Sequence, residues 1–134
     1  MTIRQQIEQF LGSPAFGVVG ASSNRHKFGN KVLRCYKQHG KTVVPVNPNE
    51  TEIEGIPCVR NVAELPAEVQ SISVITPPAV TEQVVADAIG RGIRHIWMQP
   101  GAESPAAVAL CHEKGVNVIA DGSCLLVVLG YHDH

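Results

Sequence analysis

The fold is decided by residues 16–24, Phe16-Gly17-Val18-Val19-Gly20-Ala21-Ser22-Ser23-Asn24. They form a short apolar run that ends abruptly in a turn of small residues, and a segment compatible with a helix begins near Gly29. A buried strand that passes through a glycine turn into a helix leaves backbone N–H groups exposed at the helix N-terminus, where an anionic group is stabilised. The stretch therefore predicts a phosphate-binding turn of the kind found in nucleotide sites.

Apolar strands and amphipathic helices alternate along the rest of the chain. This alternation predicts an α/β fold of the doubly wound, Rossmann-like type, with a mainly parallel sheet of five or six strands and helices on both faces. No linker, repeat or break in composition interrupts residues 1–134, so we expect one domain. The expected strands are residues 16–20, 42–46, 71–76, 95–98 and 116–120, with a short extended piece at 58–60. The expected helices are residues 3–11, 30–40, 80–91 and 104–114, with a brief one at 62–65.

Four of the expected strands end in turn residues. In open parallel sheets, ligands bind outside the carboxyl ends of the strands, near the point where the strand order reverses. We therefore expect these turns to line one groove. The four turns are Gly20-Ala21-Ser22, Asn47-Pro48-Asn49, Thr76-Pro77-Pro78 and Gln99-Pro100-Gly101.

The first turn differs from the fingerprint of dinucleotide-binding folds. That fingerprint reads G-x-G-x-x-G and places an acidic residue at the end of the second strand, where it holds the ribose hydroxyl. Here Gly20 is followed by Ala21-Ser22-Ser23, and the second strand ends in Asn47. An uncharged Asn removes the repulsion that a carboxylate would exert on an additional phosphate, so NAD is disfavoured. Gly20 also has a purely structural interpretation, in which it permits tight packing of strand against helix.

A basic cluster, Arg25-His26-Lys27, follows the glycine turn. It fits two interpretations, a source of positive charge for phosphates and a solvated loop. The P-loop pattern G-x-x-x-x-G-K-[ST] is absent, because Gly29 is followed by Asn30 and Lys31. ATP hydrolysis therefore has no support in the sequence.

The composition excludes several classes of partner. Charged residues make up 17% of the chain and the formal net charge is −1, which gives no long-range attraction to nucleic acid or to an anionic membrane. No apolar run approaches the ~18 residues of a transmembrane helix, and residues 1–10 lack the apolar core of a signal peptide. We expect a cytoplasmic protein. The four cysteines, which form no C-x-x-C pair and are expected to be reduced and not to bind zinc, are Cys35, Cys58, Cys111 and Cys124.

No acid, base or nucleophile is recognisable at the strand ends. Ser22, Asn47, Thr76 and Gln99 are polar binding groups, and the histidines form no triad or metal-ligand pattern. The terminal His132-Asp133-His134 resembles a metal-binding handle, but a frayed polar end is the favoured interpretation. We therefore expect a protein that is not an enzyme, with no catalytic and no metal-binding residues.

Six short motifs occur along the chain in a fixed order. They are Val19-Gly20-Ala21-Ser22, Val46-Asn47-Pro48-Asn49, Glu54-Gly55, Ala63-Glu64-Leu65-Pro66, Ile75-Thr76-Pro77-Pro78 and Ile96-Trp97-Met98-Gln99-Pro100-Gly101. The ordered set resembles the family of small stand-alone CoA-binding domains, which are similar to the N-terminal CoA-binding domain of the succinyl-CoA synthetase alpha subunit. The resemblance extends from about Ser13 to Leu126.

This resemblance implies non-catalytic binding of coenzyme A or an acyl-CoA, with the 3′-phospho-ADP part held by the sheet. The residues implied at the diphosphate are Gly20, Ala21, Ser22 and Ser23, with Arg25 and Lys27 as helpers matched by charge and position. The residues implied at the adenosine end are Asn47 and Pro48. The residues implied along the pantetheine arm are Thr76, Pro77, Pro78, Gln99, Pro100 and Gly101.

The chain departs from the family pattern after its last strand. The family commonly has Asp-Arg-Cys-Leu there, whereas this chain reads Asp121-Gly122-Ser123-Cys124-Leu125 and lacks the basic residue. Cys124 matches the family cysteine and fits either a buried small hydrophobe or a thiol that pairs with the thiol of CoA. The apolar run 124–129 fits a strand, a packed helix or a contact between copies.

Two alternative functions stay open at this stage. One is an NAD(P)-binding, reductase-like protein, which would need a substrate domain. The other is a regulatory subunit of an acyl-CoA ligase-type enzyme. The synthetase relatives need a phosphorylatable histidine in a second domain and a partner that binds ATP, and we expect neither within these 134 residues. A homodimer and an acyl-CoA enzyme are the protein partners under consideration.

Overall fold

Five parallel strands form the central sheet, in the order β2-β1-β5-β6-β7. The computed structural model describes residues 1–133. From β1 the chain crosses to the edge strand β2 and then returns to the other side of β1 to form β5, so the strand order reverses between β1 and β5. The strands are β1 (Ala15–Val19), β2 (Val43–Val46), β5 (Val69–Val74), β6 (His95–Met98) and β7 (Asn117–Ile119). This topology confirms the predicted Rossmann-like α/β fold, with five strands in the main sheet.

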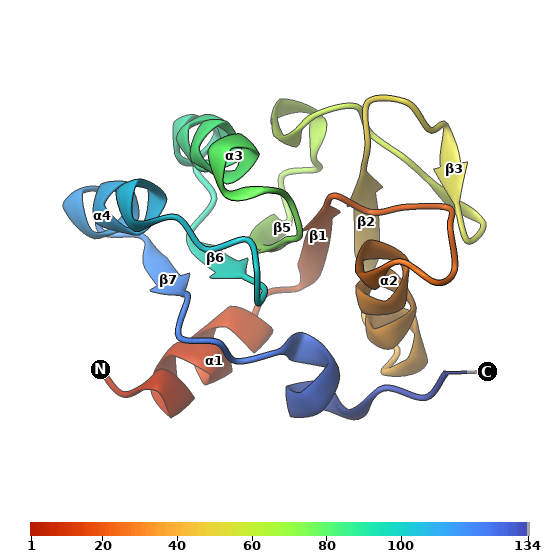
Figure 1. Ribbon diagram of the computed structural model, residues 1–134, viewed down its shortest axis with the longest axis horizontal. Coiled ribbons are helices and arrows are strands. Elements are labelled where there is room, and N and C mark those ends of the chain that lie inside the picture. Colours follow the sequence, from red (N-terminus) through yellow and green to blue (C-terminus); the bar gives the residue numbers. More distant parts are fainter. Residues whose placement is uncertain (134) are drawn as a thin grey trace.

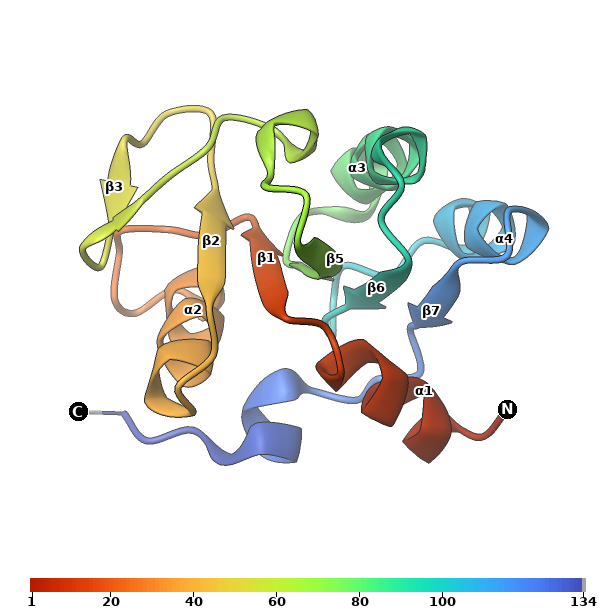
Figure 2. The same ribbon diagram turned by 180° about the vertical axis from the view of Figure 1, so that it is seen from behind.

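Helices cover both faces of the sheet (Figures 1 and 2). One face carries α1 (Ile3–Leu11), α2 (Phe28–Gln38) and a C-terminal π-helical turn (Leu126–Gly130). The other face carries α3 (Pro78–Arg91), α4 (Pro105–Glu113) and the short 3-10 turn Val62–Glu64. Side chains alternate between these two layers along each strand, because successive residues of a strand point to opposite faces.

The layer beneath α1 and α2 contains a cluster of aromatic rings. Phe10 lies edge-on to Trp97 with ring centroids 5.3 Å apart, and Phe16 stacks on Tyr36 at 4.9 Å. Their polar atoms have partners: the Tyr36 hydroxyl lies 2.6 Å from Ser73 Oγ, and Trp97 Nε1 donates to the Ser123 carbonyl at 3.0 Å. The buried indole therefore fixes the segment that follows β7.

Gly20 is a packing residue, but the close neighbour of its Cβ position is the segment after β5 and not the helix that the sequence interpretation named. Gly20 has φ of +93°, and a Cβ atom placed on it would lie 2.0 Å from the carbonyl oxygen of Ile75. No side chain fits that space, because the atom it would meet belongs to the backbone of the neighbouring chain segment. The crossover from β1 to α2 therefore requires glycine at this position, with or without a ligand.

One feature differs from the sequence expectation. A small antiparallel sheet, β3 (Glu52–Ile53) with β4 (Ile56–Pro57), forms where no strand was expected. Its two-residue turn uses Glu54 at φ 53° and Gly55 at φ 79°, the left-handed pair that suits a tight hairpin. Of the three interpretations left open for the apolar run 124–129, the structure has the packed helix, whose Leu126 and Leu129 pack on the aromatic layer.

The four thiols are unpaired in this structure. Within residues 1–133, no helix combines the length and the apolar character that crossing a bilayer demands. The same residues contain no group of three or more His, Cys, Asp or Glu side chains that could hold a metal ion.

Candidate functional site

A groove of about 470 Å³ lies at the carboxyl ends of β5 and β6. This is the edge at which open parallel sheets bind ligands, next to the point where the strand order reverses. Its lining residues are Phe28, Ile75, Thr76, Pro77, Pro100, Gly101, Ala102 and Cys124. Most of these groups are apolar, so the groove is suited to a narrow, largely apolar chain.

Four of the predicted site residues meet in this groove: Thr76, Pro77, Pro100 and Gly101. The neighbouring Pro78 is exposed and begins α3, with Pro77 at the N-cap position. Thr76 Oγ1 lies 2.7 Å from Oγ1 of the fully buried Thr81, which holds the turn against α3. The wall formed by this turn is therefore tied to the first turn of α3.

Gln99 lies beneath the groove and is not part of its lining. The residue is fully buried, and its Oε1 accepts a hydrogen bond from the Leu125 backbone N–H at 2.9 Å. Its Nε2 has no hydrogen-bond partner among residues 1–133. The side chain therefore positions the Cys124–Leu125 segment, which the sequence reasoning had not linked to it. Contact of Gln99 with a ligand stays a prediction.

Four residues that line the groove were not among the predicted site residues: Phe28, Ile75, Ala102 and Cys124. Phe28 comes from the first turn of α2, and Cys124 from the segment after β7. Cys124 could have been found from its match to the family cysteine. Phe28 had no such signal, because the turn residues that indicated the groove follow β5 and β6 and not β1. Because Phe28 directly follows the β1–α2 loop, the groove and that loop are adjacent.

The β1–α2 loop is shaped by hydrogen bonds from its own side chains. Ser22 Oγ accepts from the Asn24 backbone N–H at 3.1 Å, and Asn24 Oδ1 accepts from the His26 N–H at 3.0 Å. Ala21 is buried, Gly20 and Ser22 are half-buried, and residues 23–27 are exposed. The loop thus presents Ser23 and the basic cluster to solvent.

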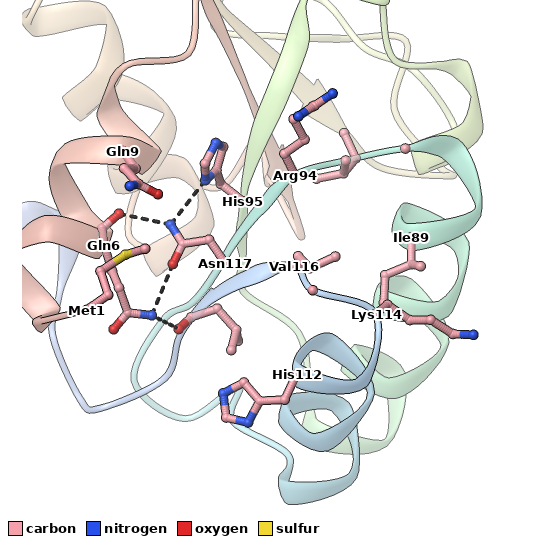
Figure 3. A pocket seen from close by; sticks show the side chains of 14 residues that line it. Met1, Gln6, Gln9, Ile89, Arg94, His95, His112, Lys114, Val116 and Asn117 are labelled. Carbon is pink, nitrogen blue, oxygen red and sulfur yellow. Dashed lines mark hydrogen bonds between the residues drawn. The ribbon is translucent and has the colours of Figure 1, made fainter.

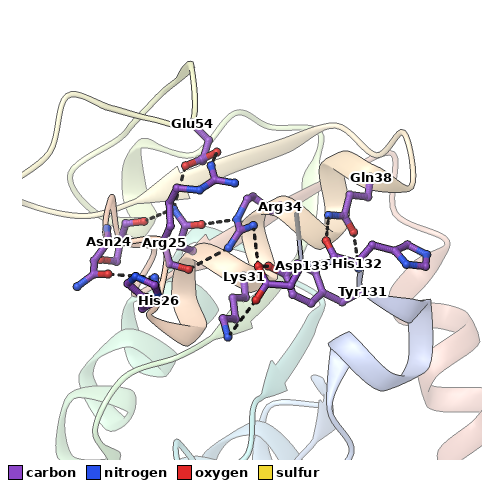
Figure 4. Close-up of polar contacts among 12 residues, drawn as sticks. Asn24, Arg25, His26, Lys31, Arg34, Gln38, Glu54, Tyr131, His132 and Asp133 are labelled. Carbon is purple, nitrogen blue, oxygen red and sulfur yellow. Dashed lines mark hydrogen bonds and ion pairs between the residues drawn. The ribbon is translucent and has the colours of Figure 1, made fainter.

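The two basic residues predicted to help bind phosphate differ in their surroundings. Arg25 pairs with Glu54 of the β3–β4 hairpin, with Nη1 2.5 Å from Oε1 (Figure 4). Burial alone would raise the pKa of the Glu54 carboxyl, but hydrogen bonds from Asn30 and Arg25 and the nearby positive charges hold that pKa below its usual value. Lys27 is exposed at the N-cap position of α2.

Asn47 ties the loops after β1 and β2 together. Its Nδ2 donates to the Ala21 carbonyl at 2.8 Å, while its Oδ1 accepts from the Asn49 N–H at 2.7 Å. The next residue, Pro48, is exposed. The structure therefore joins the predicted residues in two groups: residues 20–23 with Asn47, and the residues of the groove.

The cysteines fall into two classes. Burial raises the pKa of the Cys111 thiol to about 11, and burial together with the neighbouring Cys124 raises the pKa of Cys35 to about 11. Cys58 and Cys124 are only half-buried. Cys124 therefore combines access from solvent with a place in the groove.

The expectation of a frayed C-terminus is wrong for the described residues. Asp133 lies 3.3 Å from Arg34 Nη1 and 3.7 Å from Lys31 Nζ. The His132 backbone N–H donates to Gln38 Oε1 at 3.0 Å (Figure 4). These partners lie on α2 and were invisible to local sequence patterns. His134 lies outside the described residues.

A larger hollow of about 760 Å³ lies at the opposite, amino-terminal edge of the sheet (Figure 3). None of the predicted site residues lines it. The Asn117 amide nitrogen donates to the Gln6 carbonyl at 3.0 Å and lies 3.1 Å from His95 Nδ1, and Gln6 Nε2 donates to Asn117 Oδ1 at 3.0 Å. These groups satisfy one another and tie α1 to the sheet, so this hollow is a structural junction.

A doubly wound sheet with a groove at its carboxyl edge is the architecture of nucleotide- and cofactor-binding α/β domains. The profile of the CoA binding domain family matches residues 15–129. The chain belongs to this family.

Three proteins are similar to this chain over most of its length. Acetate–CoA ligase [ADP-forming] II subunit alpha of Pyrococcus furiosus is 24% identical over a match of 124 residues, and the match covers 84% of this chain but only 27% of that protein. The uncharacterized protein YneT of Bacillus subtilis is 25% identical over 119 residues, 88% of either chain. A solved structure of a conserved hypothetical protein from Pyrococcus furiosus is 41% identical, with a TM-score of 0.82, and the match covers 85% of this chain and 97% of that one. These matches span about a quarter of the ligase subunit and nearly the whole length of the other two proteins.

Proposed function

We propose that this chain binds coenzyme A or an acyl-CoA at the carboxyl edge of its sheet and does not transform it. The observation that carries the proposal is the groove between the turns after β5 and β6, in a chain that belongs to the CoA binding domain family. The pantetheine arm of CoA is a narrow chain with few charges, and the lining of Phe28, Ile75 and Ala102 would remove such a chain from water.

The diphosphate would lie at the adjacent start of α2. That helix has no side-chain hydrogen bond at its N-cap and no acidic residue in its first turn. The positive end of its dipole therefore meets no carboxylate from the first turn of the helix itself. Lys27 at the N-cap position adds a positive charge.

The side chains of the groove support binding without reaction. In the groove, Thr76 already shares a hydrogen bond with Thr81, and Cys124 is the remaining polar group of the lining. Neither is paired with an acid or base that would activate it among the hydrogen bonds of the described residues. A catalytic site needs such a constellation.

The relatives favour an acyl-CoA ligase-type protein as the partner of this chain. The chain corresponds to about a quarter of the acetate–CoA ligase alpha subunit, by its 27% coverage. In this proposal the remaining functions of such an enzyme belong to a separate polypeptide, and this chain supplies or withholds CoA. Co-purification with a ligase-like protein would support this role, and a second copy of the chain is the competing partner.

Isothermal titration calorimetry tests the binding proposal directly. CoA, acetyl-CoA, dephospho-CoA, NAD and ATP are titrated into the protein. We expect the tightest binding for CoA or acetyl-CoA and weaker binding for dephospho-CoA, which lacks the 3′-phosphate. A clear response to NAD without one to CoA contradicts the proposal and favours the reductase-like alternative.

A blocking variant tests the place of binding. Cys124→Phe fills the groove and should abolish CoA binding, whereas Val127→Phe adds the same ring to a side chain that is 81% exposed and should leave binding unchanged. Thermal melting of both variants controls for the fold. Full CoA affinity in a folded Cys124→Phe protein would place the pantetheine arm outside the groove.

A further inference from the structure

A network of polar side chains with two buried residues at its centre connects the β1–α2 loop to the C-terminal segment (Figure 4). Its centre is Asn30 and Arg34, one turn apart on α2 and 0% and 6% exposed. Buried amides and guanidinium groups are costly unless hydrogen-bonded. The bonds they make show what the network holds in place.

Asn30 uses both ends of its amide. Nδ2 donates to the Ser22 carbonyl at 2.8 Å and to Glu54 Oε2 at 3.2 Å, and Oδ1 accepts from Arg34 Nε at 2.6 Å. A single side chain thus connects the loop, the β3–β4 hairpin and the next turn of α2.

Arg34 extends these connections to the C-terminal segment. Its Nη2 donates to the Arg25 carbonyl at 2.9 Å, and its Nη1 donates to Asp133 Oδ1 at 3.3 Å. Its guanidinium also lies 5.4 Å from the centre of the Tyr131 ring. Asp133 therefore supplies a carboxylate for a guanidinium that is almost fully withdrawn from water.

The two carbonyl bonds fix the direction of the peptide units in the loop. In a trans peptide the C=O and the following N–H point in opposite directions. When Asn30 draws the Ser22 carbonyl toward α2, the Ser23 N–H of the same peptide unit is turned away from α2. An outward N–H in this loop is what an anion site requires.

We propose that Asn30 and Arg34 are positioning residues for the phosphate-binding loop, and that Asp133 acts on this loop through Arg34. The inference rests on the proposed binding of CoA and adds that the C-terminal segment controls its strength. In this proposal Asn30, Arg34 and Asp133 do not contact the ligand. They hold the β1–α2 loop in the conformation that binds the diphosphate.

The test compares CoA with pantetheine, which occupies the groove but has no phosphate. In Asp133→Asn, CoA affinity should fall about threefold to tenfold, the range expected when one charge-assisted hydrogen bond weakens, while pantetheine affinity stays constant. Asp133→Glu keeps the carboxylate and should retain most of the CoA affinity. Asp87→Asn, which removes an exposed carboxylate of α3, is the matched control and should bind CoA like the original protein.

Arg34→Lys gives a second, stronger test. A lysine keeps the charge but cannot make three bonds with a planar fork, so CoA affinity should fall by more than in Asp133→Asn. Equal losses for CoA and pantetheine in these variants would show general loosening of the fold and overturn the proposal. Unchanged CoA affinity in both would overturn it as well.

A readout without ligand separates this proposal from the proposed function. In ¹H–¹⁵N NMR spectra of the free protein, Asp133→Asn should shift the amide signals of residues 22–26 and speed their hydrogen exchange, while Asp87→Asn should not. Unaltered signals in this loop would disprove the link between Asp133 and the loop. If CoA fails to bind the original protein but the signals shift, the link stands and the proposed function fails.

Discussion

The start of α2 touches the end of β1 through two glycines, since a Cβ atom placed on Gly29 would lie 2.1 Å from the carbonyl oxygen of Gly20. The same Cβ would lie 3.3 Å from the Cα of Ala21. No rotamer relieves these contacts, because backbone atoms form them. The close approach brings the N-terminal turn of α2 to the edge of the sheet where the groove lies.

Gly29→Ala should therefore destabilise the fold. We expect the free energy of unfolding to fall by about 1–3 kcal/mol, as for an overpacked buried site, with a lower urea midpoint. Gly90→Ala is the control, because Gly90 also lies in a helix but has nothing within 4 Å of its Cβ position. That variant should gain up to about 1 kcal/mol from helix propensity. Equal midpoints for the two variants would show that α2 moves away from β1 at little cost.

The sequence allowed the sheet and half of the groove to be predicted, for a physical reason. Strands that alternate with helices can form only a few topologies, and ligands bind where their carboxyl ends meet. The turns containing Thr76 and Pro100 carried local signals of a strand end, and the structure brings both turns to one groove. Strand ends are local features, so one sequence suffices to find them.

The rest of the site depends on contacts between distant segments. Cys124 reaches the groove because Gln99 and Trp97 hold the segment after β7, and neither bond has a local signature. Asp133 meets Arg34 across 99 residues of sequence. The β3–β4 hairpin has two residues in each strand, too few to show alternation. Long-range hydrogen bonds of this kind were beyond the reach of a single sequence.

Thiol labelling should distinguish the cysteines and locate the ligand. At pH 8, Cys58 and Cys124 should react with an alkylating reagent first, because Cys35 and Cys111 are buried and their pKa values are raised to about 11. Saturating CoA should slow the reaction of Cys124 and leave that of Cys58 unchanged. Peptide mass spectrometry measures each rate. Protection of Cys58 with free labelling of Cys124 would contradict the placement of the ligand in the groove.

The ion pair of Glu54 should appear in the acid limb of the stability curve. Because the pKa of Glu54 is lowered in the folded protein, its stabilisation is present above its ordinary pKa of 4.5 and is lost as the pH falls through the folded value. The original protein should therefore lose more stability between pH 6 and pH 3 than Glu54→Gln, whose amide does not titrate. Urea midpoints across this range measure the difference. If the stability of the two proteins changes with pH in the same way, the charge of Glu54 does not stabilise the fold through its bonds to Arg25 and Asn30.

Asn47→Asp tests whether the link between the loops after β1 and β2 matters for binding. In the native protein, Asn47 Nδ2 donates a hydrogen bond to the Ala21 carbonyl oxygen at 2.8 Å. The substitution puts a carboxylate oxygen in place of this N–H donor, so two oxygen atoms face each other. The loop should be pushed away and CoA affinity should fall on the order of tenfold, as for loss of a well-formed bond together with repulsion of the phosphate at the adenosine end. Asn49→Asp adds the same charge two residues away on an exposed side chain and isolates the electrostatic part. Titration of CoA into both variants at low and high salt separates the two causes, because salt screens the charge but does not restore the bond. If both variants lose the same affinity and recover it in high salt, the Asn47 bond has no part in binding. If Asn47→Asp stays weak in high salt while Asn49→Asp recovers, the position of the loop is what the ligand requires.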